Sequence, residues 1–273
     1  MILADHHRIT VAVAGAGGRM GTEAVRALAG DPRFELAAVL VRDAGQARTS
    51  GRFSCPVYDD PEHLLMEVHP DVWLDLTDAR SVVGHIDRCI SFGVRPVIGA
   101  TGYTQADVAR WDEACRRQGI GGIAAPNFAI GALLMMRFAA EAARFFKRAE
   151  IIELHHDQKR DAPSGTARRT AEQMAQQRRE AAAGPSAALD EGTPPASAES
   201  LARGLAYHEI PIHSVRLPGL VAHQEVIFGG EGEVLTIRHD SLSRQSFMPG
   251  VLLACARVRE LTGMVYGLEH LLW

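Results

Sequence analysis

The chain has 273 residues, 47% of them hydrophobic, and a formal net charge of −4 at pH 7. This length suits two modest domains, or one large domain, with a sizeable core. The slightly acidic balance argues against a nucleic-acid or membrane-surface role. Four widely spaced cysteines without a CxxC pair are typical of reduced thiols, and neither a basic leader nor a long apolar run is visible. We therefore expect a soluble, cytoplasmic protein.

A glycine-rich turn stands near the start of the chain. The β-rich run Ile9–Ala14 leads into G-A-G-G-R-M-G, and apolar residues at helical spacing follow. Strand, glycine turn and helix in this order are typical of a dinucleotide phosphate site. Gly15 would allow the tight turn, Gly18 the close approach of a pyrophosphate, and Gly21 the packing of helix on strand. The spacing is G-x-x-G-x-x-G, so the prediction depends on the flanking strand and helix.

Strand-like and helical segments then alternate as far as Phe128. Expected strands cover residues 34–41, 71–76, 94–98 and 121–125, and expected helices 61–67, 79–92 and 105–117. This alternation predicts a Rossmann-like, doubly wound parallel sheet with helices on both faces. Ligands of such sheets lie at the carboxyl ends of the strands. Thr77, the G-A-T-G turn after Ile98 and the A-P-N-F turn after Ala124 lie at such ends.

After Asn127 the pattern changes. We expect an apolar helix over 129–145, a buried strand ending in the string described next, and a mobile loop over the Ala/Pro/Ser/Glu-rich residues 180–200. A meander of strands over 207–217, 220–228 and 233–240 should follow, then a helix over 247–262 and a closing turn over 268–273. Strands without intervening helices predict a second, α+β domain with a mixed or antiparallel sheet.

The string E-L-H-H-D-Q-K-R-D-A-P-S-G-T-A, which starts at Glu153, organises this second part. Because strand side chains alternate, His155 and His156 should face opposite ways and have different roles. Ser164 is a natural N-cap, and a helix start offers N–H groups to a carboxylate or phosphate. Lys159 would add a positive charge and a proton source. The string predicts a site for a small dianion with an acid beside it.

Simpler readings of the same residues exist. A histidine pair is more often incidental than catalytic, and a serine N-cap by itself marks only the start of a helix. A zinc site is disfavoured, because adjacent strand histidines are poorly placed to chelate one ion and no cysteine or HExxH motif accompanies them. We therefore expect no metal.

As a whole, H-H-x-x-K-x-D-A-P-S-G-T-A resembles the signature of the dihydrodipicolinate reductase family, the 4-hydroxy-tetrahydrodipicolinate reductases of bacterial lysine and diaminopimelate synthesis. The glycine turn, the G-A-T-G and A-P-N-F turns, and R-L-P-G-L-V-A-H-Q-E-V-I-F-G from Arg216 are similar to the family's motifs in the same order. The resemblance covers nearly the whole chain, with gaps at residues 42–58 and 180–200.

The resemblance implies an enzyme that uses NAD(P)H to reduce 4-hydroxy-tetrahydrodipicolinate to tetrahydrodipicolinate, with loss of water. It implies a dinucleotide-binding domain of residues 1–127 and 245–273 and a substrate-binding and oligomerisation domain of residues 128–244. The expected partner is a small dicarboxylate substrate, and the expected assembly is a homotetramer.

The resemblance also implies roles for particular residues. His155 and Lys159 would be catalytic, as proton donors. Substrate contacts are expected from His156, Ser164, Gly165 and Thr166, and Arg244 is a further possible site residue. Cofactor contacts are expected from Gly15, Ala16, Gly17, Gly18, Arg19, Met20, Arg42, Thr77, Gly99, Ala100, Thr101, Ala125, Pro126, Asn127 and Phe128.

Cofactor choice is predicted from the end of the second strand. An acidic residue that binds the ribose hydroxyls of NAD usually stands about 20 positions past the glycines. Val41 stands there instead, and Arg42 follows, whose guanidinium can pair with a 2′-phosphate. Arg19 could add a second charge, whereas a one-residue shift would bring the carboxylate of Asp43 to the ribose. We expect a preference for NADPH without exclusion of NADH.

Two other functions remain open from the sequence. One is a different nicotinamide-dependent enzyme of the same architecture, such as an amino-acid dehydrogenase, which the intact H-H-x-x-K string disfavours. The other is a non-catalytic nucleotide-sensing module, which the presence of His155 and Lys159 disfavours.

Overall fold

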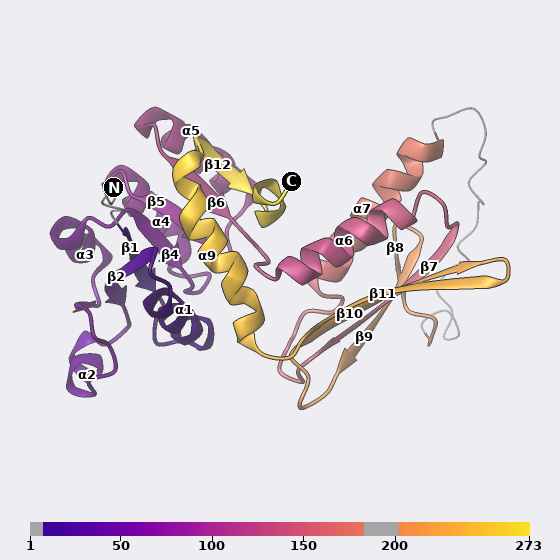
Figure 1. Cartoon of the computed structure of the whole chain (residues 1–273), viewed down its shortest axis with the longest axis horizontal. Helices are drawn as coiled ribbons and strands as arrows, with labels where there is room; N and C mark the ends of the chain where they lie inside the picture. The colour runs from indigo at the N-terminus through magenta and orange to yellow at the C-terminus, as the bar shows by residue number, and fades with distance from the viewer. Residues whose placement is uncertain (1–7, 183–201) are drawn as a thin grey trace, which may run out of the picture. The chain divides into compact units, whose positions relative to one another are not determined.

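The structure is a computed structural model that describes residues 8–182 and 202–273. The chain forms two compact units, one of Met1–Phe128 with Phe247–Trp273 and the other of Ala129–Ser246 (Figure 1). Within the described ranges, no helix is long and apolar enough to cross a membrane.

The first unit is built on a seven-stranded parallel sheet, in the order β12-β6-β5-β4-β1-β2-β3. Its strands are β1 (Ile9–Ala14), β2 (Phe34–Leu40), β3 (Val57–Tyr58), β4 (Val72–Asp75), β5 (Arg95–Ile98), β6 (Gly121–Ala124) and β12 (Gly263–Tyr266). β1 pairs with both β2 and β4, so the strand order reverses beside β1. Ligands of doubly wound sheets bind at this switch point.

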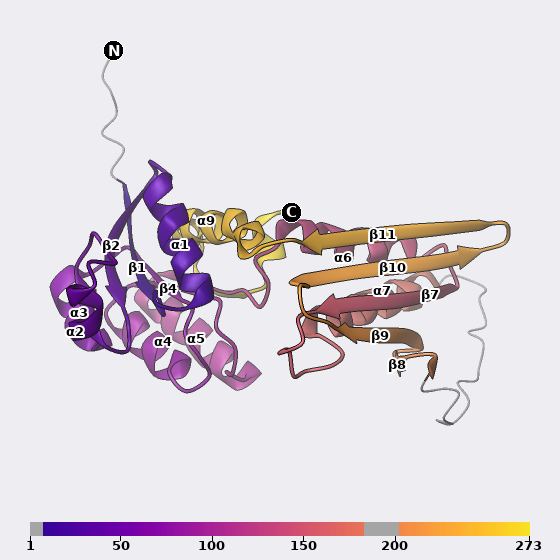
Figure 2. The same cartoon turned by 90° about the horizontal axis from the view of Figure 1, so that it is seen from below.

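Helices cover both faces of this sheet (Figure 2). α1 (Arg19–Gly30) and α9 (Met248–Arg257) lie together on one face, and α3 (Pro61–Val68), α4 (Val82–Ser91) and α5 (Gln105–Gln118) lie on the other. Alternate residues of one strand therefore enter different cores. Ala12 and Ala14 of β1 pack in one buried cluster with Trp73, Ile86 and Trp111.

The second unit has a five-stranded mixed sheet in the order β11-β10-β7-β9-β8. Its strands are β7 (Arg148–His155), β8 (Leu205–Tyr207), β9 (Ile210–Arg216), β10 (Ala222–Gly230) and β11 (Glu233–Ser241), with only the β7–β9 pair parallel. α6 (Ile130–Ala142) and α7 (Gly165–Ala182) pack against one face of the sheet. The predicted fold class, a Rossmann-like sheet with a second α+β unit, is confirmed.

Several local predictions need correction. The single strand expected over 207–217 is a hairpin of β8 and β9, because His208 and Glu209 adopt positive φ angles of 49° and 65° and turn the chain. The expected meander is interrupted, because β7 lies between β9 and β10. The short elements α2 (Ala44–Thr49), β3 and β12 were not predicted.

The chain ends also differ in detail from expectation. The helix expected over 247–262 is the 3₁₀ turn η1 (Arg244–Phe247), α9 and a second 3₁₀ turn (Val258–Glu260), and the closing turn is a third (Leu268–Leu271). The loop expected over 180–200 begins inside α7, which continues to Ala182, and its remainder lies outside the described residues.

One glycine of the turn is required by packing. A Cβ on Gly21 would lie 2.2 Å from the carbonyl oxygen of Gly15, which is backbone and cannot move aside, whereas a Cβ on Gly30 at the end of the same helix meets nothing within 4 Å. We predict that Gly21→Ala lowers the free energy of unfolding by about 1–3 kcal/mol through overpacking. Gly30→Ala should be neutral or stabilising, by up to about 1 kcal/mol.

Tryptophan fluorescence during urea unfolding measures this difference, because Trp73, Trp111 and Trp273 all belong to the first unit. Equal effects of the two substitutions would contradict the packing argument.

Candidate active site

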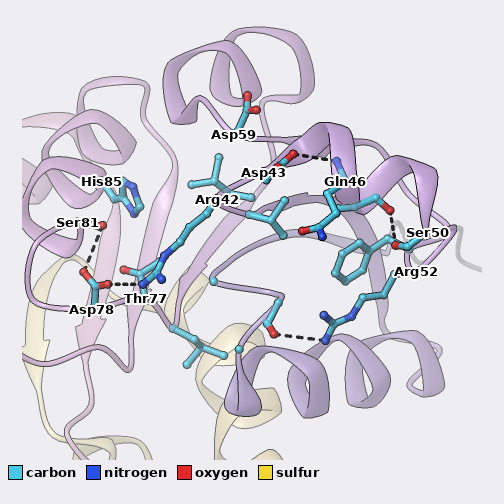
Figure 3. A pocket seen from close by; sticks show the side chains of 18 residues that line it. Arg42, Asp43, Gln46, Ser50, Arg52, Asp59, Thr77, Asp78, Ser81 and His85 are labelled. Carbon is cyan, nitrogen blue, oxygen red and sulfur yellow. Dashed lines mark hydrogen bonds and ion pairs between the residues drawn. The ribbon is translucent and has the colours of Figure 1, made fainter.

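A cavity of about 860 Å³ opens at the carboxyl ends of β1, β2 and β4 (Figure 3). It is lined by the glycine turn, the residues that follow β2 and β4, and the start of α4. These residues are Gly15, Gly17, Gly18, Leu40, Val41, Arg42, Asp43, Gln46, Ala47, Ser50, Arg52, Phe53, Asp59, Leu76, Thr77, Asp78, Ser81 and His85.

The glycine turn forms a cradle without side chains. Gly15 has a φ of +78°, and a Cβ there would lie 2.6 Å from the carbonyl oxygen of Leu76. Gly18 is the N-cap of α1, and neither a capping side chain nor an acidic residue occupies the first turn of that helix. The N–H groups at the helix start are thus available to an anion, and the cradle fits the diphosphate of a dinucleotide.

Two arginines from different segments enter the cavity (Figure 3). Arg42 follows β2, and its Nη2 lies 2.9 Å from Oδ2 of Asp78, which follows β4. Arg52 donates from Nη2 to Oγ1 of Thr22 (2.7 Å) and to the carbonyl oxygen of Gly17 (3.4 Å). No ion pair of Arg52 is found within the described ranges of the chain. Its positive charge therefore lies beside the glycine turn, and the two acceptors that it contacts there are neutral.

Two carboxylates lie near Arg42: Asp43 follows it in the chain, and Asp78 lies across the cavity. Their surroundings differ. Asp43 accepts a hydrogen bond from the N–H of Gln46 (2.8 Å) and so caps the start of α2. The backbone N–H of Arg80 lowers the pKa of Asp78 below its ordinary value of 3.8; burial opposes this by a smaller amount, and the guanidinium of Arg42 lowers the pKa further. The Asp78 carboxylate is therefore ionised at neutral pH and forms an ion pair with the guanidinium of Arg42.

A buried carboxylate organises the wall after β4. Asp75 has no exposed surface and accepts hydrogen bonds from Nε1 of Trp73 (3.0 Å) and from the N–H of Thr77 (3.1 Å). Nδ1 of His85 lies 2.9 Å from the same carboxylate. These bonds hold Thr77 and His85 in fixed positions on the cavity wall.

The structure gathers some of the predicted cofactor residues in this cavity, namely Gly15, Gly17, Gly18, Arg42 and Thr77. Arg19 is exposed at the start of α1 and is not among the lining residues. The remaining predicted residues also lie outside the lining: Ala16, Met20, Gly99, Ala100, Thr101, Ala125, Pro126, Asn127 and Phe128. Of these, Ala16, Ala100, Ala125 and Phe128 are buried.

The second candidate centre lies where β7 ends. Glu153 has no exposed surface, and Oε2 lies 2.5 Å from Nδ1 of His155, two positions along the same strand face. Arg216 of β9 donates to both carboxylate oxygens of Glu153, at 2.8 and 2.7 Å. Burial by itself would raise the pKa of Glu153, but hydrogen bonds from His155 and Arg216 lower it to about 2.

The ionised state of Glu153 determines the tautomer of His155. A carboxylate can only accept hydrogen bonds, so Nδ1 of His155 carries the proton of the pair. Nε2 remains as the atom through which His155 can exchange a proton with a ligand.

The same carboxylate ties this histidine to the start of α7. The N–H of Ser164 donates to Oε1 of Glu153 (3.1 Å), and Oγ of Ser164 accepts from the N–H of Ala167 (3.2 Å). Ser164 is therefore an N-cap, as predicted. A Cβ added to Gly165 meets nothing within 4 Å, so the helix start is open beside the anchored histidine.

Lys159 belongs to the loop between β7 and α7. Its Nζ lies 2.8 and 2.9 Å from the two carboxylate oxygens of Asp161, and its side chain is 22% exposed. Arg216 also donates to the carbonyl oxygen of Asp161 (2.7 Å), which fixes this loop to β9. His156 lies just past the end of β7, and its carbonyl oxygen accepts from the N–H of Lys159 (3.1 Å).

The structure thus brings together His155, Ser164, Gly165 and the loop that carries Lys159. Thr166 lies in the first turn of α7, and Arg244 opens the 3₁₀ turn η1. Sequence reasoning did not single out Glu153 or Arg216, or Arg52, Asp78 and His85 in the first cavity. Strand alternation could have paired Glu153 with His155, whereas the others depend on contacts between distant segments.

A parallel sheet with a glycine cradle at its switch point defines a dinucleotide-binding protein of the Rossmann class. Comparison with known proteins gives the family. The sequence matches the family description "Dihydrodipicolinate reductase, N-terminus" over residues 9–128 and "Dihydrodipicolinate reductase, C-terminus" over residues 131–272. The chain belongs to the dihydrodipicolinate reductase family, and the predicted family and oxidoreductase class are confirmed.

Individual relatives agree over almost the whole chain. The 4-hydroxy-tetrahydrodipicolinate reductase of Geobacillus thermodenitrificans is 51% identical, covering 97% of this chain and 99% of that protein. The enzyme of the same name from Lactococcus lactis subsp. cremoris is 47% identical, covering 97% and 98%. The structure of dipicolinate-bound dihydrodipicolinate reductase from Paenisporosarcina sp. TG-14 is 46% identical, with a TM-score of 0.82 and coverage of 97% and 99%.

The lowered pKa of Glu153 predicts how stability depends on pH. Its folded pKa of about 2 lies below the ordinary value of 4.5, so the carboxylate stabilises the fold above pH 4.5 and loses this effect as pH falls towards 2. Glu153→Gln leaves Arg216 without its charge partner and should cost about 3 kcal/mol at neutral pH. The difference from wild type should shrink as pH falls through that window.

Urea unfolding followed by circular dichroism at several pH values measures the effect. Glu150→Gln is the matched control, because Glu150 stands on the same strand in a half-exposed pair with His213. It should change the free energy of unfolding by less than about 0.5 kcal/mol. A pH-independent loss in Glu153→Gln would show that its carboxylate is not held ionised by these partners.

Proposed function

We propose that this chain catalyses the reduction of 4-hydroxy-tetrahydrodipicolinate by NAD(P)H, with loss of water to give tetrahydrodipicolinate. The observation that carries the proposal is the anchoring of His155 by buried Glu153 beside the open start of α7. This arrangement supplies a proton-exchanging group next to an anion site, as hydride reduction of a substrate that carries two carboxylates requires. Consumption of NADPH tests the activity when the preceding synthase supplies the substrate in situ from pyruvate and aspartate semialdehyde, and no consumption would refute it.

The first unit is proposed as the cofactor domain. Gly15, Gly17 and Gly18 would hold the diphosphate against the start of α1, and Arg52 would add a positive charge at that end. Thr77 would contact the nucleotide from the wall built on Asp75. When bound, the nicotinamide group supplies the hydride for the reduction.

The second unit is proposed as the substrate and oligomerisation domain. The N–H groups of Gly165 and Thr166 and the side chains of Ser164 and His156 would hold a substrate carboxylate, favoured by the positive end of α7. The relative from Paenisporosarcina is described as bound to dipicolinate, a dicarboxylate, which supports a substrate of that class here.

The proton is proposed to pass through Nε2 of His155. The Glu153 carboxylate would stabilise the imidazolium form and keep the ring in one orientation. Lys159 would act as the second proton donor, and its charge would stabilise negative charge that develops on the substrate. In the structure this ammonium is paired with Asp161, so a substrate carboxylate would have to share it with that residue. Arg244 is proposed as an accessory contact.

The assembly is proposed to be a homotetramer, as the family resemblance implies. The sheet face opposite α6 and α7, viewed in Figure 2, carries the half-buried side chains of Ile152, Leu154 and Ile227, and no described helix covers it. Light scattering on the purified protein tests this, and a monomer mass would refute it.

The proposed roles of His155 and Lys159 predict a loss of turnover. His155→Ala and Lys159→Ala should each lower kcat by about 10²-fold or more, the scale of a positioned proton donor. The dissociation constant of NADPH should change little, because both residues belong to the second unit.

His213→Ala and Lys147→Ala remove the same groups from exposed or half-exposed positions of the same unit, and they should retain near-wild-type kcat. Near-wild-type turnover in His155→Ala and Lys159→Ala would refute their catalytic assignment.

NADPH is proposed as the preferred cofactor, with NADH also accepted. Arg42 lines the cavity and can pair with a 2′-phosphate, whereas Asp43 is engaged as a helix cap. Arg42→Ala should therefore weaken NADPH binding by roughly 1.5 kcal/mol, about tenfold, and change NADH binding by less than about twofold.

Titration of both cofactors into wild type, Arg42→Ala and Arg26→Ala measures this, since Arg26 is an exposed arginine of α1 and controls for net charge. Equal losses for the two cofactors, or tighter NADH binding in wild type, would show that Arg42 does not read the 2′-phosphate.

A further inference from the structure

The ion pair between Arg42 and Asp78 crosses the cavity above the glycine turn. β1 lies between β2 and β4, and neighbouring strands are about 4.8 Å apart. Arg42, two positions after β2, and Asp78, three positions after β4, therefore stand on opposite sides of the end of β1. Figure 3 shows the side chain of Arg42 reaching across this interval to Asp78, at 2.9 Å.

The two partners of this pair differ in freedom. Asp78 accepts hydrogen bonds at Oδ1 from the N–H of Arg80 (3.0 Å) and from Oγ of Ser81 (3.4 Å), which leaves Oδ2 for Arg42. Its carbonyl oxygen accepts from the N–H groups of Ser81 and Val82, so its backbone is part of the start of α4. The side chain of Arg42, by contrast, is 93% exposed. The Arg42 side chain can therefore move to another partner, whereas the Asp78 carboxylate is held in place by its own hydrogen bonds.

We infer that Asp78 is a cofactor-specificity residue, whose carboxylate competes with the cofactor's 2′-phosphate for Arg42 and so limits the preference for NADPH. The inference rests on the proposed function, in which Arg42 binds that phosphate. NADPH exchanges one anionic partner of Arg42 for another and places its phosphate near a fixed carboxylate. NADH carries no group that requires the exchange. The Asp78 carboxylate thus weakens the binding of NADPH and leaves the binding of NADH nearly unaffected.

Asp78→Asn tests the inference with little disturbance of the turn. The asparagine side chain keeps an oxygen for the N–H of Arg80, and the backbone bonds to α4 are unchanged. Since the ion pair is exposed to solvent, its removal should have a modest effect: the Kd of NADPH should fall about fivefold and that of NADH should change less than about twofold. The gain should shrink at high ionic strength, because these charges are exposed.

Asp59→Asn is the matched control. Asp59 is an exposed carboxylate that lines the same cavity, and it forms no ion pair with an arginine among the residues that the structure describes; it accepts a hydrogen bond from the N–H of Ala44, at 3.4 Å. Its substitution reports the effect of removing one negative charge from the cavity and should change the Kd of NADPH by less than about twofold. An equal gain in both variants would overturn the inference, because the effect would then be one of general charge.

The double variant Arg42→Ala/Asp78→Asn completes a cycle. If the competition exists, Asp78→Asn should tighten NADPH by less than about twofold once Arg42 is absent. Weaker NADH binding in Asp78→Asn would overturn the inference by showing that the carboxylate accepts hydrogen bonds from ribose. If Arg42→Ala has no effect on NADPH, the proposed role of Arg42 fails. If Arg42→Ala weakens NADPH but Asp78→Asn does not tighten it, only the inference fails.

Discussion

The second unit depends on one buried carboxylate. Glu153 has no exposed surface, and a charge in such a place is tolerated only when donors surround it. Arg216 supplies two of these donors, and His155 and the N–H of Ser164 supply two more. These partners come from β7, β9 and the start of α7. The interaction that satisfies the charge is therefore also the one that brings the histidine to the helix.

Each of the two units contains a buried carboxylate that holds a histidine, but the two carboxylates have different roles. Asp75 at the end of β4 is also fully buried, and it also holds a histidine, His85, through Nδ1. Around Asp75 the donors include an indole and a backbone N–H, and the result is a fixed wall of the nucleotide cavity. Around Glu153 the donors include an arginine, and the result is a histidine with one nitrogen left for a ligand.

Much of this architecture was predictable because strands of a parallel sheet are buried on both faces and read as continuous apolar runs. β1 and the glycine turn after it, for example, were located from the sequence. Elements without such a run were missed: β3 has two residues, and α2 is a short polar helix. The turn at His208 and Glu209 was missed because neither residue is a usual turn former, although both adopt positive φ.

The candidate sites divide in the same way. Ser164 was correctly predicted as an N-cap, because an N-cap is a local pattern. The Arg42–Asp78 and Glu153–Arg216 pairs join residues 36 and 63 positions apart, respectively. No local spacing signals such a pair. Arg52 could not be predicted either, since it lies in residues 42–58, where the sequence does not resemble the family.

The first unit is discontinuous, and this has a consequence for synthesis of the chain. Its outer strand β12 pairs with β6, although the whole second unit lies between them in the sequence. On the ribosome the second unit is complete while β12 is still to be made. Until residues 248–266 have been synthesised, the edge of β6 lacks its partner strand, and the face of the sheet that α9 covers stays exposed. The first unit, whose synthesis begins first, is therefore the last of the two to be completed.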